Sequence, residues 1–437
     1  MTSSQTITLV VLAAVVTAMI WDKLRSDVVA LAGAAVLLMT GVVRPVDIQG
    51  AFASPAIIAL AALFVIAYAL ELSGLLDAAI RAATGLCRLI GRAGIWIIIA
   101  LAGGASAFLN NTPIVVLSAP VVRDVARSLR LSPKRFLIPL SYAAVLGGCC
   151  TLIGTSTNLL VNDMAMNAGQ PRFGIFEISP VGLSVAVAGG LYLLLFSGRL
   201  IRPVPEVEEE PAQPSTLVAE PGLAGGQLGS SLPFAEARRL RPLRALVSLA
   251  VFVGVVALAA LEVAPIAACA FSGAVLLILL RVITADEAYR GLRPEVLMLI
   301  AGMVVLGTAL AQSGLASTAT SALVGSLEGI SPVVALIILY GVTLFATELL
   351  SNATVAVLLT PVALSLAETL HVSPRPFLVA VMIAGSAAFA TPFGYQTNVV
   401  VYQMGRYNYL DFVRVGIPLN LLTWAVGIAA ILAYFPF

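Results

Sequence analysis

Long apolar runs alternate with short polar segments along almost the whole chain of 437 residues. A helix of roughly 20 apolar residues crosses the hydrocarbon core of a membrane, which is about 30 Å thick. The pattern therefore predicts an all-α polytopic membrane protein. The expected spanning segments are 7–21, 28–43, 56–72, 137–161 and 180–195 in the first half, and 245–261, 264–280, 296–311, 377–404 and 415–434 in the second.

Two further apolar segments contain polar residues where a spanning helix would be interrupted. Segment 94–123 contains an Asn-Asn-Thr-Pro motif at 110–113, and segment 330–366 contains a Ser-Asn-Ala motif at 351–353. A broken helix at membrane depth is tolerated where its backbone lines a cavity. We therefore predict that each segment is a re-entrant hairpin, which enters and leaves the membrane on the same side.

The polar motif of the first hairpin recurs in the second, because Asn111 corresponds to Asn352, 241 positions later. Each hairpin is followed by a second polar cluster, Gly-Thr-Ser-Thr-Asn at 154–158 and Gly-Tyr-Gln-Thr-Asn at 394–398. Matching motifs in the same order indicate an internal duplication, and such repeats are typical of secondary transporters.

The duplication divides the chain into a first repeat at 1–199 and a second at 244–437. Between them, residues 200–243 are acidic and proline-rich, then rich in glycine and serine, which is typical of a flexible linker. Two segments that follow the third span of each repeat, 75–92 and 315–327, are expected to lie at the membrane interface.

Lysine and arginine positions predict how the repeats are inserted. Each repeat contains five spans, an odd number, so the second repeat is expected to be inverted relative to the first. With both termini outside, 21 of the 24 Lys and Arg residues face the cytoplasm with the linker, and Arg44, Arg172 and Arg375 face out. This distribution agrees with the positive-inside rule. The hairpin tips then meet near the midplane of the cell membrane.

The polar residues at the hairpin tips predict an ion-binding site, because polar groups in apolar sequence are unfavourable unless they bind something. Backbone N–H groups at the start of a half-helix favour anions, whereas carbonyl ends and Asn, Ser or Thr oxygens suit Na⁺. No Lys or Arg lies at either tip. An anion is thus expected to be held by neutral donors, helix ends and bound cations. The simpler alternative is that these side chains only hydrogen-bond helices together.

Glu348 lies within the second hairpin, and Ala107 occupies the corresponding position of the first. An intramembrane carboxylate can carry a proton or bind Na⁺. It can equally accept hydrogen bonds from the backbone of a loop. The sequence leaves both roles open.

Composition excludes several classes of function. Charged residues are 11% of the chain, against about 25% in soluble domains, and the arginines form no stripe that would support nucleic-acid binding. The sequence contains no nucleophile–base pair and no metal-ligand cluster, so an enzyme is not expected. No cofactor is expected beyond Na⁺ as a coupling ion.

With these motifs in hand, nearly the whole chain resembles the divalent anion/sodium symporter family, the sodium:sulfate/dicarboxylate symporters of the ion transporter superfamily. The motifs at 110–112 and 351–353 stand where the family has a Ser-Asn-Thr signature in each hairpin. The resemblance implies a homodimer in which scaffold helices hold the two subunits together. It also implies that the hairpins and their following spans move as a transport domain, by an elevator-type mechanism.

The resemblance further implies two Na⁺ sites with a substrate between them. The Na⁺ ligands would be Ser106, Asn110, Asn111 and Gly154 in the first repeat, and Thr347, Ser351, Asn352 and Gly394 in the second. The substrate would lie near Asn110, Asn111, Thr112, Thr157, Asn158, Ser351, Asn352, Thr397 and Asn398.

Two departures from the family motif bear on the substrate. Asn110 replaces the family's serine, and Ala353 replaces its threonine. Both motifs contribute to carboxylate recognition in dicarboxylate carriers, so the sequence favours sulfate, with a dicarboxylate next. The alternative function within the superfamily is a cation/proton antiporter or an arsenite-type efflux carrier, with Glu348 as the proton site.

Overall fold

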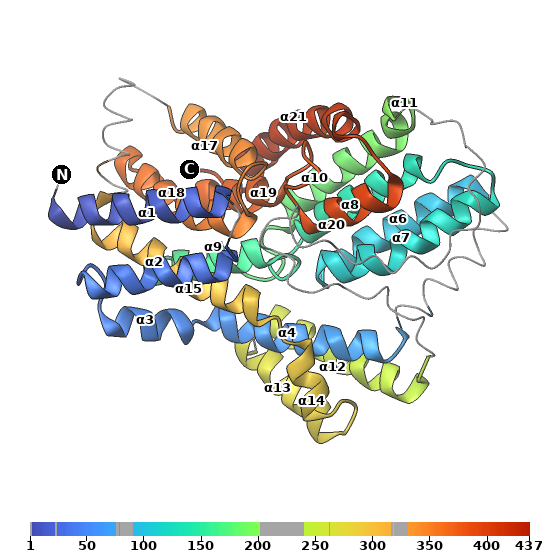
Figure 1. The fold of residues 1–437 in the computed structure, drawn as a ribbon, viewed down its shortest axis with the longest axis horizontal. Coiled ribbons are helices and arrows are strands. Elements are labelled where there is room, and N and C mark those ends of the chain that lie inside the picture. The colour runs from blue at the N-terminus through green and yellow to red at the C-terminus, as the bar shows by residue number, and fades with distance from the viewer. Residues whose placement is uncertain are drawn as a thin grey trace.

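The computed structural model describes residues 2–21, 24–75, 78, 91–201, 240–261, 263–315, 318 and 331–437. Within these ranges all regular structure is helical, which confirms the all-α prediction (Figure 1). Six of the described helices are long and apolar enough to cross a membrane. Almost all of the linker and most of the two expected interfacial segments lie outside the described residues.

The described helices form two packing groups. In the first, which we call the scaffold group, α2 packs along α15 and α4 packs along α13. The backbones of α2 and α15 approach closely, because a Cβ atom added to Gly302 would lie 2.9 Å from the Cβ of Ala30. The group consists of α1 (Ser3–Trp21), α2 (Ser26–Met39), α3 (Pro45–Phe52), α4 (Pro55–Leu72), α12 (Pro242–Ala260), α13 (Ile266–Leu279), α14 (Ala285–Gly291) and α15 (Pro294–Gln312).

The second group, which we call the hairpin group, interleaves the two halves of the chain. Helix α20 packs on α7 and α8, α21 packs along α10, and α9 packs against α18 and α19. The group consists of α6 (Arg92–Ser106), α7 (Asn111–Ser128), α8 (Lys134–Gly148), α9 (Ser156–Asn167), α10 (Ser179–Tyr192), a π-helical turn (Leu193–Ser197), α11 (Gly198–Leu200), α17 (Pro332–Ala346), α18 (Asn352–Leu370), α19 (Arg375–Ser386), α20 (Gln396–Gly405) and α21 (Tyr409–Tyr434).

The two groups meet where α15 packs on α18 and where α4 and α15 reach α9. At the last of these contacts the Ser54 hydroxyl, which caps α4, donates a hydrogen bond of 2.6 Å to Oδ2 of Asp163 on α9. Both side chains are buried. Both ends of the chain lie toward the left of Figure 1, whereas α11, which precedes the linker, lies at the right.

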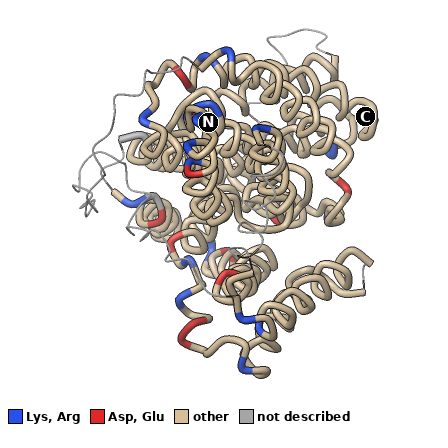
Figure 2. The backbone as a smooth tube through the Cα atoms, turned by 90° about the vertical axis from the view of Figure 1, so that its right-hand side faces the viewer, with Lys and Arg blue, Asp and Glu red and all other residues tan. Residues whose placement is uncertain are grey.

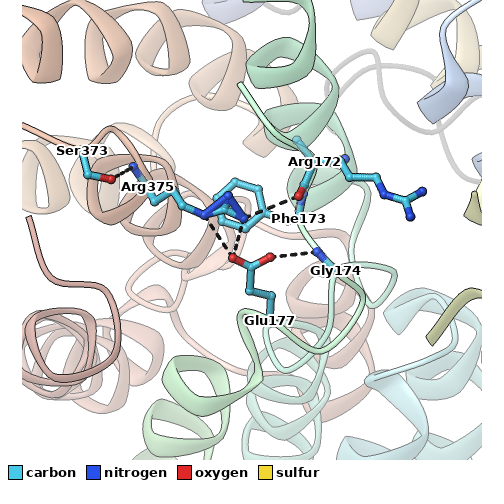
Figure 3. Close-up of polar contacts among 7 residues, drawn as sticks. Arg172, Phe173, Gly174, Glu177, Ser373 and Arg375 are labelled. Carbon is cyan, nitrogen blue, oxygen red and sulfur yellow. Dashed lines mark hydrogen bonds and ion pairs between the residues drawn. The ribbon is translucent and has the colours of Figure 1, made fainter. Parts of the chain in front are cut away.

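Charged residues are sparse and lie mostly near turns and helix ends (Figure 2). An ion pair between Arg375 and Glu177 joins the two halves of the hairpin group (Figure 3). Nη2 of Arg375, at the start of α19, lies 2.5 Å from Oε1 of Glu177, in the segment before α10. The guanidinium also lies 4.3 Å from the ring centroid of Phe173. The cluster therefore fastens the two repeats together beside α10 and α19.

The apolar pattern does not predict two short helices, α3 and α14. They begin at Pro45 and Ala285, 240 positions apart, and in each the third helical residue, Asp47 or Glu287, accepts a hydrogen bond from the N–H of the residue before the helix. In α14 the Thr284 hydroxyl also accepts from the Glu287 N–H, which completes a capping box. The spacing of Thr284 and Glu287 is a sequence signal for a helix start. The helices are too short for the periodicity of apolar residues to reveal them.

Candidate functional site

The two hairpin tips have the same internal hydrogen bond. In the first hairpin, α6 and α7, the Ser106 hydroxyl donates to Oδ1 of Asn111 at 2.5 Å. In the second hairpin, α17 and α18, the Thr347 hydroxyl donates to Oδ1 of Asn352 at 2.9 Å. The residue that ends one half-helix thus fixes the amide that begins the next. Each tip thereby places an amide and a hydroxyl oxygen side by side.

The helix that follows each tip has a polar N-cap. The Asn110 side chain accepts a hydrogen bond from the Thr112 N–H at the start of α7, and the Ser351 hydroxyl accepts one from the Thr354 N–H at the start of α18. Such caps satisfy backbone donors that a helix start leaves without an intrahelical partner. The replacement of serine by asparagine at 110 therefore keeps the capping role.

The second polar clusters lie at breaks in the next spans, between α8 and α9 at 149–155 and between α19 and α20 at 387–395. Nδ2 of Asn158 donates to the Thr151 carbonyl at 3.0 Å, and Nδ2 of Asn398 donates to the Thr391 carbonyl at 3.1 Å. These amides therefore brace their own breaks. Thr397 and the Asn398 amide oxygen also accept hydrogen bonds from the Ser141 hydroxyl.

A cavity of about 260 Å³ lies between the tips, the breaks and the scaffold group. Within the described residues, four helices of the hairpin group begin at this cavity: α7, α9, α18 and α20. Helix starts carry partial positive charge and backbone N–H donors, so four of them at one place favour an anion. The polar hairpin-group residues that line the cavity are Asn110, Thr112, Thr155, Ser156, Thr157, Ser351, Asn352, Tyr395 and Gln396.

The predicted substrate residues divide into two sets. Five of them line the cavity, namely Asn110, Thr112, Thr157, Ser351 and Asn352. The other four are buried behind its wall and make the internal hydrogen bonds described above, namely Asn111, Asn158, Thr397 and Asn398.

The repeats interlock across the cavity. Nδ2 of Asn111 donates to the Tyr395 hydroxyl at 2.8 Å, and the Thr112 hydroxyl donates to Oε1 of Gln396 at 3.2 Å. Both acceptors begin α20 in the second repeat. The sequence motifs did not single out Tyr395 or Gln396 individually, although both lie within the 394–398 cluster.

Oxygen atoms converge at the first break around Gly154. A Cβ atom added there would lie 2.4 Å from the Gly148 carbonyl oxygen and 2.9 Å from that of Ala107. A Cβ atom added to Gly148 would lie 2.9 Å from Oδ1 of Asn111. Carbonyl and amide oxygens around a residue without a side chain are the type of ligand that a hard cation prefers. We call this arrangement the first cradle.

The equivalent second cradle, around Gly394, has a different wall. A Cβ atom added to Gly394 would lie 2.9 Å from the Thr391 hydroxyl oxygen and 3.2 Å from Oε2 of Glu348. The Thr347 hydroxyl and Oδ1 of Asn352 lie at the neighbouring hairpin tip. The Thr347 hydroxyl also lies 2.8 Å from the carbonyl oxygen of Gly385. The second cradle is therefore bounded by a carboxylate, which the first cradle lacks.

Glu348 is surrounded by hydrogen-bond donors. Oε1 accepts from the N–H groups of Phe389 and Ala390 at 2.8 and 2.7 Å. It also accepts from Nδ2 of Asn420 at 2.7 Å. Oε2 accepts from the N–H and the hydroxyl of Thr391, both at 2.9 Å. Backbone N–H and amide NH₂ groups only donate hydrogen bonds, so both oxygens of Glu348 act as acceptors for the second break and for α21.

Charged side chains from the scaffold group also line the cavity. They are Arg25 and Asp27 at the start of α2, and Arg293 and Glu295 at the start of α15. Arg25 and Asp27 form a two-point ion pair of 2.8 and 3.1 Å, and these hydrogen bonds raise the pKa of Arg25 above its ordinary value. The absence of Lys and Arg from the tips holds, but the cavity as a whole does contain arginine. No pattern in the sequence predicts these arginines at the cavity, because they are remote from both hairpins along the chain.

Comparisons with known proteins agree with this architecture. The family model CitMHS: Citrate transporter matches residues 16–369 and 349–437. The Uncharacterized transporter sll0640 of Synechocystis is 24% identical over 98% of this chain and 97% of its own length. Probable sodium/sulfate cotransporter 3 of Chlamydomonas reinhardtii is 47% identical, over 21% of this chain and 11% of its own.

A solved structure shares the fold. The crystal structure of the YdaH transporter of Alcanivorax borkumensis superimposes with a TM-score of 0.61 over 88% of this chain and 86% of that chain, at 15% sequence identity. The family resemblance expected from the hairpin motifs is confirmed by the family match. The chain therefore belongs to the CitMHS family of the ion transporter superfamily and is a multi-pass membrane transporter, not an enzyme.

Proposed function

We propose that this protein is a secondary active transporter that couples the entry of Na⁺ to the uptake of a small divalent anion, with sulfate favoured and a dicarboxylate next. The observation that carries the proposal is the meeting of four helix starts at one cavity, next to two cradles of oxygen atoms. Helix starts attract the anion, and the cradles suit the cation. Each bound cation strengthens an anion site that has only neutral donors in the hairpin group.

Each repeat provides one Na⁺ site in this proposal. The first uses Ser106, Asn110, Asn111 and Gly154, and the second uses Thr347, Ser351, Asn352 and Gly394. Inward movement of Na⁺ yields about 2.3 kcal/mol per charge for each 100 mV of membrane potential. Every Na⁺ in excess of the anion's charge therefore draws on this potential to accumulate the substrate.

Two observations favour a small inorganic anion. Ala353 lines the cavity but has no hydroxyl group, whereas its counterpart Thr112 contributes one that already binds Gln396. The second hairpin thus lacks the hydroxyl group that the family motif has at this position for recognition of a carboxylate group. In addition, a relative with a matching segment is named a probable sodium/sulfate cotransporter, although its match covers 21% of this chain.

The two packing groups support an elevator-type movement. We propose that the scaffold group holds a homodimer together and that the hairpin group moves as one body, because its two repeats interleave extensively. The repeats would be inverted, with 1–199 and 244–437 on either side of a cytoplasmic linker and both termini outside. In that orientation Arg25 and Arg293, which line the cavity, would lie on its cytoplasmic side.

The rival function is cation/proton exchange through Glu348. The contacts of Glu348 favour a structural role, because its two oxygens are occupied by donors from the second break and from α21. A proton carrier must release and accept a proton during transport. Both oxygens of Glu348 already accept the hydrogen bonds that hold the second break in place.

Thermal unfolding of the purified protein in detergent tests the proposal. A ligand that binds only the folded state raises the melting temperature, and at 100 times its Kd it adds about 2.7 kcal/mol. We expect NaCl to stabilise the protein relative to choline chloride, and potassium sulfate to add a further increase only when Na⁺ is present. An equal effect of sulfate in choline chloride would contradict the coupling. Potassium succinate and citrate in parallel tubes rank the other candidate anions.

A further inference from the structure

We propose that Arg293 of the scaffold group binds the transported anion when the cavity is open on the side of α2 and α15, and so sets the affinity for the anion on that side. This inference rests on the proposed anion transport. It adds a charged ligand that does not belong to the hairpins and that the hairpin motifs do not include.

The first observation is the position of Arg293. It is the N-cap residue of α15 and lines the same cavity as Asn110 of the first hairpin and Ser351 of the second. Its side chain is partly buried, and the guanidinium carbon lies 6.0 Å from the ring centroid of Phe64, which also lines the cavity. The aromatic ring attracts the guanidinium and limits where it can lie.

The second observation is that Arg293 has unused hydrogen-bond donors. Among the residues that the structure describes, no hydrogen bond or ion pair is formed by its guanidinium, whereas Arg25 across the same cavity is paired at two points with Asp27. A guanidinium offers five N–H donors in a planar fork that matches carboxylate or tetrahedral oxyanions. A partly desolvated guanidinium without such a partner favours an incoming anion.

The surrounding charges define the strength of this attraction. Glu295 lines the cavity as an exposed side chain near Arg293, and its carboxylate is not within ion-pair distance of the guanidinium. Its negative charge opposes an anion, as does that of Asp27. Arg293 therefore offsets repulsion that an anion would otherwise meet between the scaffold group and the hairpin tips.

The orientation predicted from the positive-inside rule places Arg293 on the cytoplasmic side. In an elevator movement the scaffold stays in place while the hairpin group carries the anion. Arg293 would then contact the anion only while the site faces the cytoplasm, and would govern its release there. The exterior-facing state would bind the anion without this residue.

Equilibrium binding of ³⁵S-labelled sulfate to the purified full-length protein tests this inference, at saturating Na⁺ and low ionic strength. We expect Arg293→Gln to raise the Kd for sulfate about tenfold, which is about 1.4 kcal/mol. Arg293→Lys keeps the charge but loses the planar fork of donors, so it should raise the Kd by an intermediate amount, about threefold. The matched control is Arg290→Gln, which removes an exposed arginine of α14 outside the cavity and should change the Kd less than twofold.

A variant of a nearby negatively charged residue, Glu295, provides a second test of the same inference. Glu295→Gln removes a negative charge and should lower the Kd for sulfate by about threefold, whereas a loss of structure would raise it. With sulfate at the same multiple of each variant's own Kd, the Na⁺ concentration for half-maximal binding should be unchanged in all four variants, which shows that the cradles are intact. If Arg293→Gln and Arg290→Gln bind sulfate equally well, Arg293 does not contact the anion. If the wild-type protein binds no sulfate in Na⁺, the proposed function for sulfate fails, and this inference fails with it.

Discussion

The backbone N–H groups at the first and second breaks find their hydrogen-bond acceptors in different ways. In the first, α8 continues to Gly148, and the N–H groups of Cys149 and Cys150 still reach carbonyl oxygens one turn back. In the second, α19 ends at Ser386, and the corresponding N–H groups of Phe389 and Ala390 bind Glu348 instead. A carboxylate thus replaces a turn of helix.

This difference explains why one hairpin has glutamate where the other has alanine. Buried backbone N–H groups require an acceptor, and leaving one without a partner costs about 1–3 kcal/mol. Ala107 needs no side-chain acceptor, because the first break satisfies its own N–H groups. The better candidates for ion binding are therefore the features common to both repeats, namely the tip amides and the cradle glycines. Glu348 is better explained by a structural role, as the acceptor for the N–H groups of the second break.

The largest expected effect comes from removing this acceptor. Glu348→Ala leaves at least three backbone N–H groups without a partner and should lower the free energy of unfolding by about 4 kcal/mol or more. Glu348→Gln should also be strongly destabilising, because its NH₂ group would face donors. Thermal unfolding in detergent measures both. A Glu348→Gln protein with wild-type stability and no proton exchange would instead support the antiporter.

The cradle glycines provide the next test. Gly154→Ala places a methyl group 2.4 Å from a backbone oxygen, and overpacking of this kind costs about 1–3 kcal/mol. Gly394→Ala meets side-chain atoms at 2.9 Å, so its cost should be smaller. We expect Gly154→Ala to abolish Na⁺-dependent transport and Gly394→Ala to weaken it. Equal losses in both would show that the cradles are alike despite Glu348.

Substitution of the break threonines should also lower stability more at the second break than at the first. The Thr151 hydroxyl donates to the Ala107 carbonyl, and that of Thr391 donates to Glu348 and also accepts from the Gly394 N–H. Thr391→Val should therefore cost about 2 kcal/mol and Thr151→Val about 1 kcal/mol, at roughly 1 kcal/mol per hydrogen bond. Chemical denaturation of the two purified variants measures this difference in the free energy of unfolding. A larger loss for Thr151→Val would reverse the comparison.

The smallest and most nearly equal effects are expected at the hairpin tips. Ser106→Ala and Thr347→Val each remove the hydroxyl that fixes a tip amide, at about 1 kcal/mol of stability. Both should raise the Na⁺ concentration for half-maximal uptake several-fold. Na⁺ activation curves for the two variants provide the measurement. An effect at one tip alone would mean that only one repeat binds Na⁺.

The sequence predicted the hairpins and their motifs because polar residues in apolar sequence stand out. Asn111 and Asn352 do lie at equivalent tips, and Asn110 and Ser351 do line one cavity. The direction of the second-cluster amides could not be predicted, because the same Asn can face a cavity or brace a break. Asn158 and Asn398 do the latter.

The scaffold side of the cavity was not predictable for a different reason. Arg293 lies in the second repeat before α15, far along the chain from both tips, and only packing brings it to the cavity. Local periodicity carries no information on which distant helices meet. The role of Glu348 is not predictable for a related reason, since its partners Phe389 and Asn420 come from the second break and from α21.

The most direct test of the central claim is uptake of ³⁵S-labelled sulfate into proteoliposomes, with and without an inward Na⁺ gradient. We predict uptake that requires Na⁺ and that is lost in both Asn111→Ala and Asn352→Ala, because each repeat supplies one cation site. Exclusion of sulfate while Na⁺ entry drives protons out would contradict the account and would make the protein an exchanger.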